Sequence, residues 1–118
     1  MVKKIAFTLY PVSDMARARR FYGEGLGLAE SDNFDDRWVE FTVGGGVFAI
    51  CDMPEVGKPA MGSGGSIAFE VDDVDAAIAR LVEAGAKIVM AAFDTPVCRM
   101  GIVADTEGNS ICIHKVTA

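Results

Sequence analysis

The sequence predicts an α+β fold made of two βαβββ units, and two observations lead to this prediction. Short apolar stretches typical of strands alternate with segments whose apolar residues recur at helical spacing. The pattern then starts again after residue 65, and a shift of 59 positions places Val12 on Val71 and Tyr22 on Leu81. Equivalent helix starts and equivalent apolar positions indicate a repeated structural unit.

The repeat sets the expected domain organisation. With 118 residues, the chain is expected to form a single domain. Its two repeats cover about 1–52 and 66–118, and a connection rich in Gly and Pro, 53–65, joins them.

Each element of the first unit has its own signal. Apolar residues predict a strand over 4–12, and Ser13 is the expected N-cap of a helix over 13–23. The apolar face of this helix is formed by Met15, Ala18 and Tyr22. Three more strands are expected at 28–33, 37–43 and 47–52, the last two joined by a glycine hairpin.

The second unit follows the same plan. A strand is expected at 66–71, and Asp72 is the expected N-cap of a helix that ends at Gly85. Further strands are expected at 87–92, 99–104 and 110–115, with a turn at 105–109 before the last one.

Composition and charge exclude several classes of function. Lys and Arg number 11 against 17 Asp and Glu, which gives a net charge of −6. Because binding to phosphates requires clustered cations, we expect neither a nucleic-acid partner nor an anionic membrane surface. Apolar runs stay well short of the ~20 residues that a membrane span requires. The three cysteines form no CxxC pair, and the N-terminal stretch lacks signal-peptide features, so a cytoplasmic protein is expected.

Two phrases of the sequence carry a family resemblance, together with a D-x-x-G-N turn at 105–109: FTLYPVSDMARARRFYGEGLGL and SIAFEVDDVDAAIARLVEAGA. With them the chain resembles the vicinal oxygen chelate superfamily, which includes glyoxalase I, bleomycin-resistance proteins, fosfomycin-resistance proteins and extradiol dioxygenases. The resemblance implies that the eight strands curl into a mixed sheet shaped as a cup, with the helices outside. It also implies a small-molecule ligand in the cup and a homodimer.

The resemblance further implies where a metal ion would bind. Enzymes of this superfamily take a His or Gln from the first strand of each unit and a Glu from the last strand. In this chain those positions fall on Phe7, Ser66 and Cys112, and on either Ala49 or Cys51. Hard divalent ions prefer carboxylate, imidazole and water ligands, so the usual metal site is expected to be absent and no cofactor is expected.

Alternation of side chains along strands adds candidates on the face of the cup. The expected ligand-binding residues are Phe7, Leu9, Trp38, Cys51, Ser66, Glu70, Cys112 and His114. Trp38 and Phe7 either form an aromatic wall for a planar ligand or are ordinary core residues. Two thiols with His114 would suit zinc by ligand type, but cysteines more often fill space in a sheet.

Glu70 and His114 are the candidate catalytic residues. His114, the single histidine, is either a base or hydrogen-bonding group near neutral pH or a half-solvated residue near the C-terminus. Glu70 is either a desolvated carboxylate with a raised pKa or an acid at a strand edge that reaches solvent or pairs with Arg99.

Three functions remain open on the sequence. The first is a metal-free pocket that binds a small, partly aromatic molecule. The second is a metal-dependent enzyme of the glyoxalase or dioxygenase type whose ligands come from Glu70, His114 and the cysteines. The third is a protein whose dimer surface is its function. Convergence of Glu70 and His114 within ligand reach is the feature expected to separate the first two.

Overall fold

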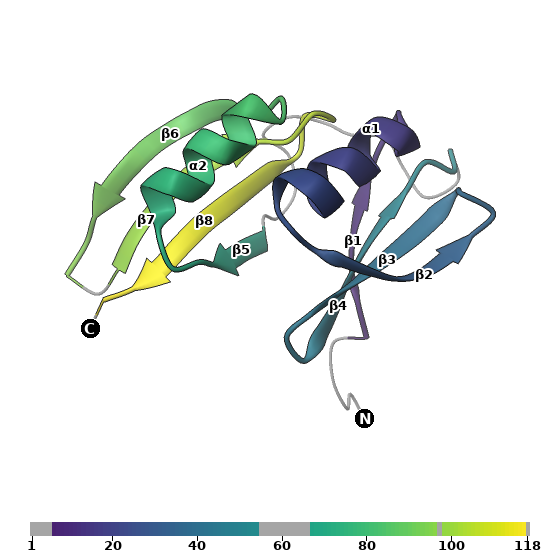
Figure 1. The fold of residues 1–118 in the computed structure, drawn as a ribbon, viewed down its shortest axis with the longest axis horizontal. Helices are drawn as coiled ribbons and strands as arrows, with labels where there is room; N and C mark the ends of the chain where they lie inside the picture. Colours follow the sequence, from purple (N-terminus) through teal and green to yellow (C-terminus); the bar gives the residue numbers. More distant parts are fainter. Residues whose placement is uncertain (1–5, 55–66, 97, 118) are drawn as a thin grey trace. The chain divides into compact units, whose positions relative to one another are not determined.

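The computed structural model describes residues 6–54, 67–96 and 98–117. The chain divides into two compact units, Met1–Pro59 (unit 1) and Ala60–Ala118 (unit 2). Each unit is a βαβββ arrangement with helical residues against one four-stranded sheet (Figure 1). The predicted α+β class and the repeated unit are therefore confirmed.

Unit 1 contains a mixed sheet in the order β1-β4-β3-β2, in which β1 and β4 are parallel and the other neighbours are antiparallel. Its elements are β1 (Thr8–Pro11), α1 (Met15–Arg19), η1 (Arg20–Gly25), β2 (Ala29–Phe34), β3 (Trp38–Val43) and β4 (Gly46–Cys51). The predicted strand over 4–12 is thus shorter, and its first residues lie outside the described part of the chain.

Unit 2 repeats the topology, with the sheet order β5-β8-β7-β6 and a parallel β5–β8 pair. Its elements are β5 (Ile67–Glu70), α2 (Val74–Glu83), β6 (Lys87–Asp94), β7 (Cys98–Ala104) and β8 (Ser110–Val116). Figure 1 shows α2 lying across one face of this sheet, where it contacts β6, β7 and β8. Neither described helical segment is long and apolar enough to cross a membrane.

Both predicted helix caps were wrong by one residue. The N-cap of α1 is Asp14, whose Oδ1 accepts a hydrogen bond from the Arg17 N–H at 3.0 Å. The N-cap of α2 is Asp73, whose Oδ1 accepts from the Ala76 N–H at 3.0 Å. Asp14 and Asp73 have the extended backbone that directs a capping side chain to these N–H groups. Ser13 and Asp72 each lie one residue too early in the chain. The two observed caps are again 59 positions apart, so the repeat extends to the capping hydrogen bond.

The first helical segment was predicted as one α-helix over 13–23, but its second half widens. From Arg20 to Gly25 the backbone forms a π-helix, and the Leu26 N–H bonds to the Phe21 carbonyl at 2.9 Å. The wider turn lets two successive aromatic side chains, Phe21 and Tyr22, both lie buried. Only Tyr22 was expected on the apolar face.

The core of unit 1 lies between this helical segment and its sheet. Its buried aromatic rings contact one another in a chain of edge-on, tilted and stacked pairs, formed by Tyr10, Phe21, Tyr22, Phe41 and Phe48. The core of unit 2 is mostly aliphatic: Ile78 and Leu81 of α2 and Ile111 and Ile113 of β8 are buried, and Phe69 of β5 is its buried aromatic ring. In each unit helical residues cover one face of the sheet. The opposite face, called the open face of that unit below, carries no helix of the same unit.

Gly101 allows α2 to pack closely on the sheet of unit 2. A Cβ at this position would lie 2.7 Å from Ile78 Cδ1 and 3.2 Å from the Met90 carbonyl oxygen. Gly101→Ala is therefore expected to lower the free energy of unfolding by about 1–3 kcal/mol through overpacking. Urea denaturation measures this loss.

A compensating variant tests the cause. Ile78→Val removes the Cδ1 atom that the new methyl would meet, so Gly101→Ala should cost less in that background than in the wild-type chain. Equal costs in the two backgrounds would show that Ile78 is not the obstacle.

Candidate functional site

The open face of unit 1 is lined by alternate residues of β3. Trp38 and Glu40 are half-buried and Thr42 is exposed, whereas Val39 and Phe41, which point to the helix side, are fully buried. Cross-strand partners share a face, so the register places Ala49 beside Glu40 and Cys51 beside Trp38.

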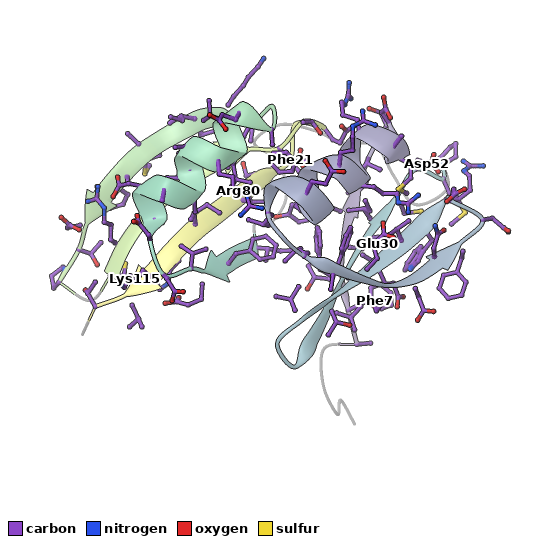
Figure 2. The ribbon with its side chains drawn as sticks, viewed as in Figure 1. Phe7, Phe21, Glu30, Asp52, Arg80 and Lys115 are labelled. Carbon is purple, nitrogen blue, oxygen red and sulfur yellow. The ribbon has the colours of Figure 1, made fainter. Side chains whose placement is uncertain are left out.

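An aromatic group stands at one end of this face. The Phe7 and Trp38 rings meet edge-on, with centroids 5.3 Å apart and planes at 85°. Phe34, the β2 partner of Trp38, is 55% exposed, and Phe7 is 42% exposed. The Phe7 ring is labelled in Figure 2. These rings are therefore surface groups of unit 1 and not part of its core.

Trp38 is held in place by a residue that was not among the predicted site residues. Its indole Nε1–H donates to Glu40 Oε2 at 3.0 Å. Alternation along β3 was the available signal, but the register of this middle strand could not be assigned from the sequence.

Two other predicted residues lie on the same face at different depths. Leu9 is half-buried and pairs with Ala49 across the parallel ladder. Cys51 is fully buried, and its Sγ accepts a hydrogen bond from the Met53 N–H at 3.4 Å.

The open face of unit 2 is largely apolar. Cys112 lies between Ala68 and Ile102, and His114 lies between Glu70 and Met100. The edge strand adds Met90 and Phe93, the partners of Ile102 and Met100, which are 45% and 39% exposed. The predicted residues Glu70, Cys112 and His114 thus share one face, whereas Ser66 lies outside the described residues. Irregular pairing of β6 hid Met90 and Phe93 from a simple alternation argument.

Glu70 and His114 form a direct pair. Glu70 Oε1 lies 2.6 Å from His114 Nδ1, and Glu70 Oε2 accepts a hydrogen bond from the Val116 N–H at 2.7 Å. The two β8 partners of Glu70, His114 and Val116, stand on either side of Lys115, which Figure 2 labels. Glu70 and His114 therefore converge in unit 2, which is the feature expected to separate a metal-free binding protein from a metal-dependent enzyme.

Of the two environments left open for Glu70, the structure shows the acid at a strand edge that reaches solvent and not the desolvated carboxylate. Its carboxylate is 55% exposed, and the Val116 N–H and His114 hold its pKa below the ordinary value of 4.5. Arg99 does not pair with it, because that guanidinium binds Asp75 at 2.9 Å and Asp94 at 3.2 Å. Hydrogen bonds to the ionised carboxylate outweigh its desolvation, which is small at an exposed strand end.

The lowered pKa of Glu70 predicts a pH dependence of stability. The folded state favours the ionised carboxylate, so its contribution is present above pH 4.5 and is lost as the pH falls through the folded-state pKa. The difference in free energy of unfolding between wild type and Glu70→Gln should therefore shrink in acid. Urea denaturation between neutral and acidic pH measures it.

Glu83→Gln on the exposed side of α2 is the matched control. The difference in free energy of unfolding between this variant and wild type should not shrink in acid in the same way. Because the Glu70–His114 pair is partly exposed, added salt should weaken the effect. A difference that grows as the pH falls would contradict the assignment.

The residues at the family's metal positions do not fit a hard divalent ion. Phe7 offers a ring, and Ala49 and Cys51 are fully buried in β4. Burial, together with the neighbouring Cys98, raises the pKa of the Cys112 thiol and so disfavours the thiolate that binds metals. Across the described residues, no three His, Cys, Asp or Glu side chains gather closely enough to hold a metal ion.

A separate surface hollow lies on the helix side of unit 1. It is lined by Ala16, Arg19, Arg20, Gly23, Glu24 and Glu30. Arg19 and Glu30 pair across it at 2.6 Å, which raises the pKa of the guanidinium (Figure 2 labels Glu30). None of the predicted site residues lines this hollow.

Comparisons with known proteins agree with this description of the fold. A family model described as Glyoxalase/Bleomycin resistance protein/Dioxygenase superfamily matches residues 4–113. Curated proteins yield no match.

Solved structures give full-length matches. A glyoxalase-related enzyme from Fulvimarina pelagi is 24% identical, with a TM-score of 0.82 and 99% of each chain covered. TnmS3, an antibiotic binding protein from Streptomyces sp. CB03234, is 26% identical, with a TM-score of 0.74 and 98% of each chain covered. Lactoylglutathione lyase from Agrobacterium tumefaciens is 20% identical, with a TM-score of 0.74, 97% of this chain covered and 94% of that chain.

Proposed function

The chain belongs to the Glyoxalase/Bleomycin resistance protein/Dioxygenase superfamily, and from this premise we propose that it binds a small, partly aromatic organic molecule without a metal ion. The observation that carries the proposal is the surface chemistry of the open sheet faces. Large apolar side chains are exposed there. The polar side chains among them are few, and hydrogen bonds fix their positions, as for Glu40 with Trp38 and Glu70 with His114. Ligand sites in proteins combine these two properties.

The exposed aromatic and apolar side chains support an apolar ligand. Phe7, Phe34 and Trp38 gather on the open face of unit 1, and Met90 and Phe93 lie on that of unit 2. Exposed apolar groups of this size are unfavourable in water unless another surface or a ligand covers them. Aromatic rings suit a planar ligand, and flexible methionines adapt to its outline.

The donor set supports the absence of a metal ion. A phenyl ring, buried small side chains and a thiol with a raised pKa stand where relatives are expected to have ligands. The net charge of −6 is compatible with a cationic ligand. One neighbour in structure is itself described as an antibiotic binding protein, which supports a binding function of this kind.

The metal-dependent enzyme is the weaker alternative. Glu70 and His114 do converge, as that alternative requires. A metal centre needs at least one more donor, and among the described residues no third His, Cys, Asp or Glu joins the pair.

The proposal includes a cytoplasmic homodimer. The three cysteines, Cys51, Cys98 and Cys112, are free, as is usual in a reducing compartment. A second copy would cover apolar surface that the described units leave exposed. Analytical ultracentrifugation measures the association state directly.

A ligand screen tests the proposal. Trp38 is the single tryptophan, so its fluorescence reports on the open face of unit 1. A ligand from a broad library is expected to raise the melting temperature and to quench this fluorescence, since about 100 times Kd of free ligand adds about 2.7 kcal/mol of stability.

A variant and a metal assay complete the test. Trp38→Ala should reduce the ligand-induced shift, whereas Val82→Ala, which removes an exposed apolar residue of α2, should leave it unchanged. Elemental analysis of protein purified without chelator should find no stoichiometric first-row metal. A stoichiometric metal, or a library in which nothing stabilises the protein, would refute the proposal.

A further inference from the structure

The Glu70–His114 pair fixes the direction of the histidine's hydrogen bonds. Glu70 and His114 are direct partners in the parallel β5–β8 ladder. Both carboxylate oxygens are engaged, one by His114 Nδ1 at 2.6 Å and the other by the Val116 N–H at 2.7 Å. An ionised carboxylate only accepts hydrogen bonds, so His114 Nδ1 must carry the hydrogen.

The other ring nitrogen is then a hydrogen-bond acceptor. In a neutral imidazole with hydrogen on Nδ1, Nε2 carries a lone pair. The His114 side chain is 30% exposed, and within the described part of the chain its ring bonds to Glu70 through Nδ1 alone. Nε2 is therefore free to accept from a ligand.

The surroundings of this acceptor are apolar. Met100 is the β7 partner of His114, and Phe93 is the β6 partner of Met100. Glu70 is the charged side chain in contact with the ring, and it lies at Nδ1. The charged neighbours along the strands point to the opposite face: Lys115 alternates with His114 along β8, and Arg99 alternates with Met100 along β7 and binds Asp75 and Asp94. One acceptor on an apolar surface selects ligands that place a donor there.

We propose that Glu70 is a positioning residue that fixes the hydrogen of the His114 ring on Nδ1, so that Nε2 of the neutral ring accepts a hydrogen bond from an acidic hydroxyl of the bound molecule. The inference rests on the proposed small-molecule function and narrows the ligand class to hydroxylated aromatics. An apolar ring fits the Met100 and Phe93 surface, and the hydroxyl supplies the donor.

Glu70→Gln inverts this arrangement. Glutamine has one acceptor oxygen, and we expect the Val116 N–H to donate to it. The amide NH₂ group then faces His114 Nδ1. Nδ1 then becomes the acceptor and the hydrogen moves to Nε2. Glu70→Ala removes the acceptor altogether and is the second variant, while Glu83→Gln is the control.

Nitrogen-15 NMR reads the tautomer directly, because the chain has a single histidine. At a pH where the ring is neutral, wild type and Glu83→Gln should show hydrogen on Nδ1, and Glu70→Gln should show it on Nε2. Glu70→Ala should lose the preference for Nδ1. Hydrogen on Nε2 in wild type, or on Nδ1 in Glu70→Gln, would overturn the inference without touching the proposed binding function.

A pair of probe molecules tests the ligand class. 2-Naphthol carries an acidic hydroxyl, and 2-methoxynaphthalene does not. Wild type should bind the naphthol about tenfold more tightly, as one net hydrogen bond implies, and this preference should disappear in Glu70→Gln. Equal affinity of wild type for the two probes, or a preference that survives in Glu70→Gln, would exclude the hydroxyl contact.

Discussion

Replacing Phe41 with alanine is expected to lower the free energy of unfolding by about 3–5 kcal/mol, the usual cost of removing a buried ring. Phe41 is fully buried between the helical segment and the sheet of unit 1. Its ring stacks on Phe48, its β4 partner, with centroids 6.1 Å apart, and it also lies 6.3 Å from Tyr22. The truncation therefore opens a cavity among rings that cannot all move to fill it. Urea denaturation measures the loss.

Neighbouring substitutions identify the cause. Phe41→Leu keeps most of the buried volume and should cost clearly less than Phe41→Ala. Thr42→Ala changes the next residue of β3, which lies exposed on the open face, and should cost about 0.5 kcal/mol or less. A loss for Phe41→Ala as small as that of Thr42→Ala would mean that the aromatic core does not stabilise unit 1 as described.

The order of elements could be predicted from the sequence because its physical causes are local. Alternation and helical spacing reflect which side chains face a core, and these patterns located every described strand to within a few residues. The helix starts were less certain, since Ser13-Asp14 and Asp72-Asp73 each offer two adjacent residues able to cap. Backbone angles decide between them, and these depend on how the preceding strand enters the helix.

The π-helix at 20–25 shows a tertiary effect. Helical spacing puts only one of Phe21 and Tyr22 on the apolar face, but the sheet of unit 1 buries both. The gain from burying a second ring stabilises a wider turn that local propensity does not favour.

The face that Glu70 and His114 share could be predicted from the sequence, whereas the electrostatics of Glu70 were left open. Alternation was enough to put Glu70 and His114 on one face. The pKa of Glu70 depends on Val116, which is two residues beyond its ladder partner His114, where β8 continues past the end of β5. No pattern in the sequence reveals that a backbone N–H lies at that position. The sequence therefore could not decide between a desolvated carboxylate with a raised pKa and an acid that reaches solvent, whose pKa the structure lowers.

Asp105→Ala is expected to lower the free energy of unfolding by about 2–4 kcal/mol, because several donors near a buried carboxylate lose their acceptor together. Asp105 Oδ1 accepts from the Glu107 N–H at 2.9 Å and from the Asn109 N–H at 2.8 Å. Its Oδ2 accepts from Asn109 Nδ2 at 3.3 Å. Asp105 is 4% exposed, so water does not easily replace the carboxylate.

Asp105→Asn separates hydrogen bonding from packing. Asparagine keeps one oxygen for the two backbone N–H groups but places an NH₂ group near Asn109 Nδ2, so it should lose less stability than alanine. This turn joins β7 to β8, and β8 carries Cys112 and His114. Amide hydrogen exchange in β8 should therefore accelerate in Asp105→Ala more than in Asp105→Asn. If the two variants are equally stable, the carboxylate does not anchor the turn, and the position of His114 must depend on β5 and β7 alone.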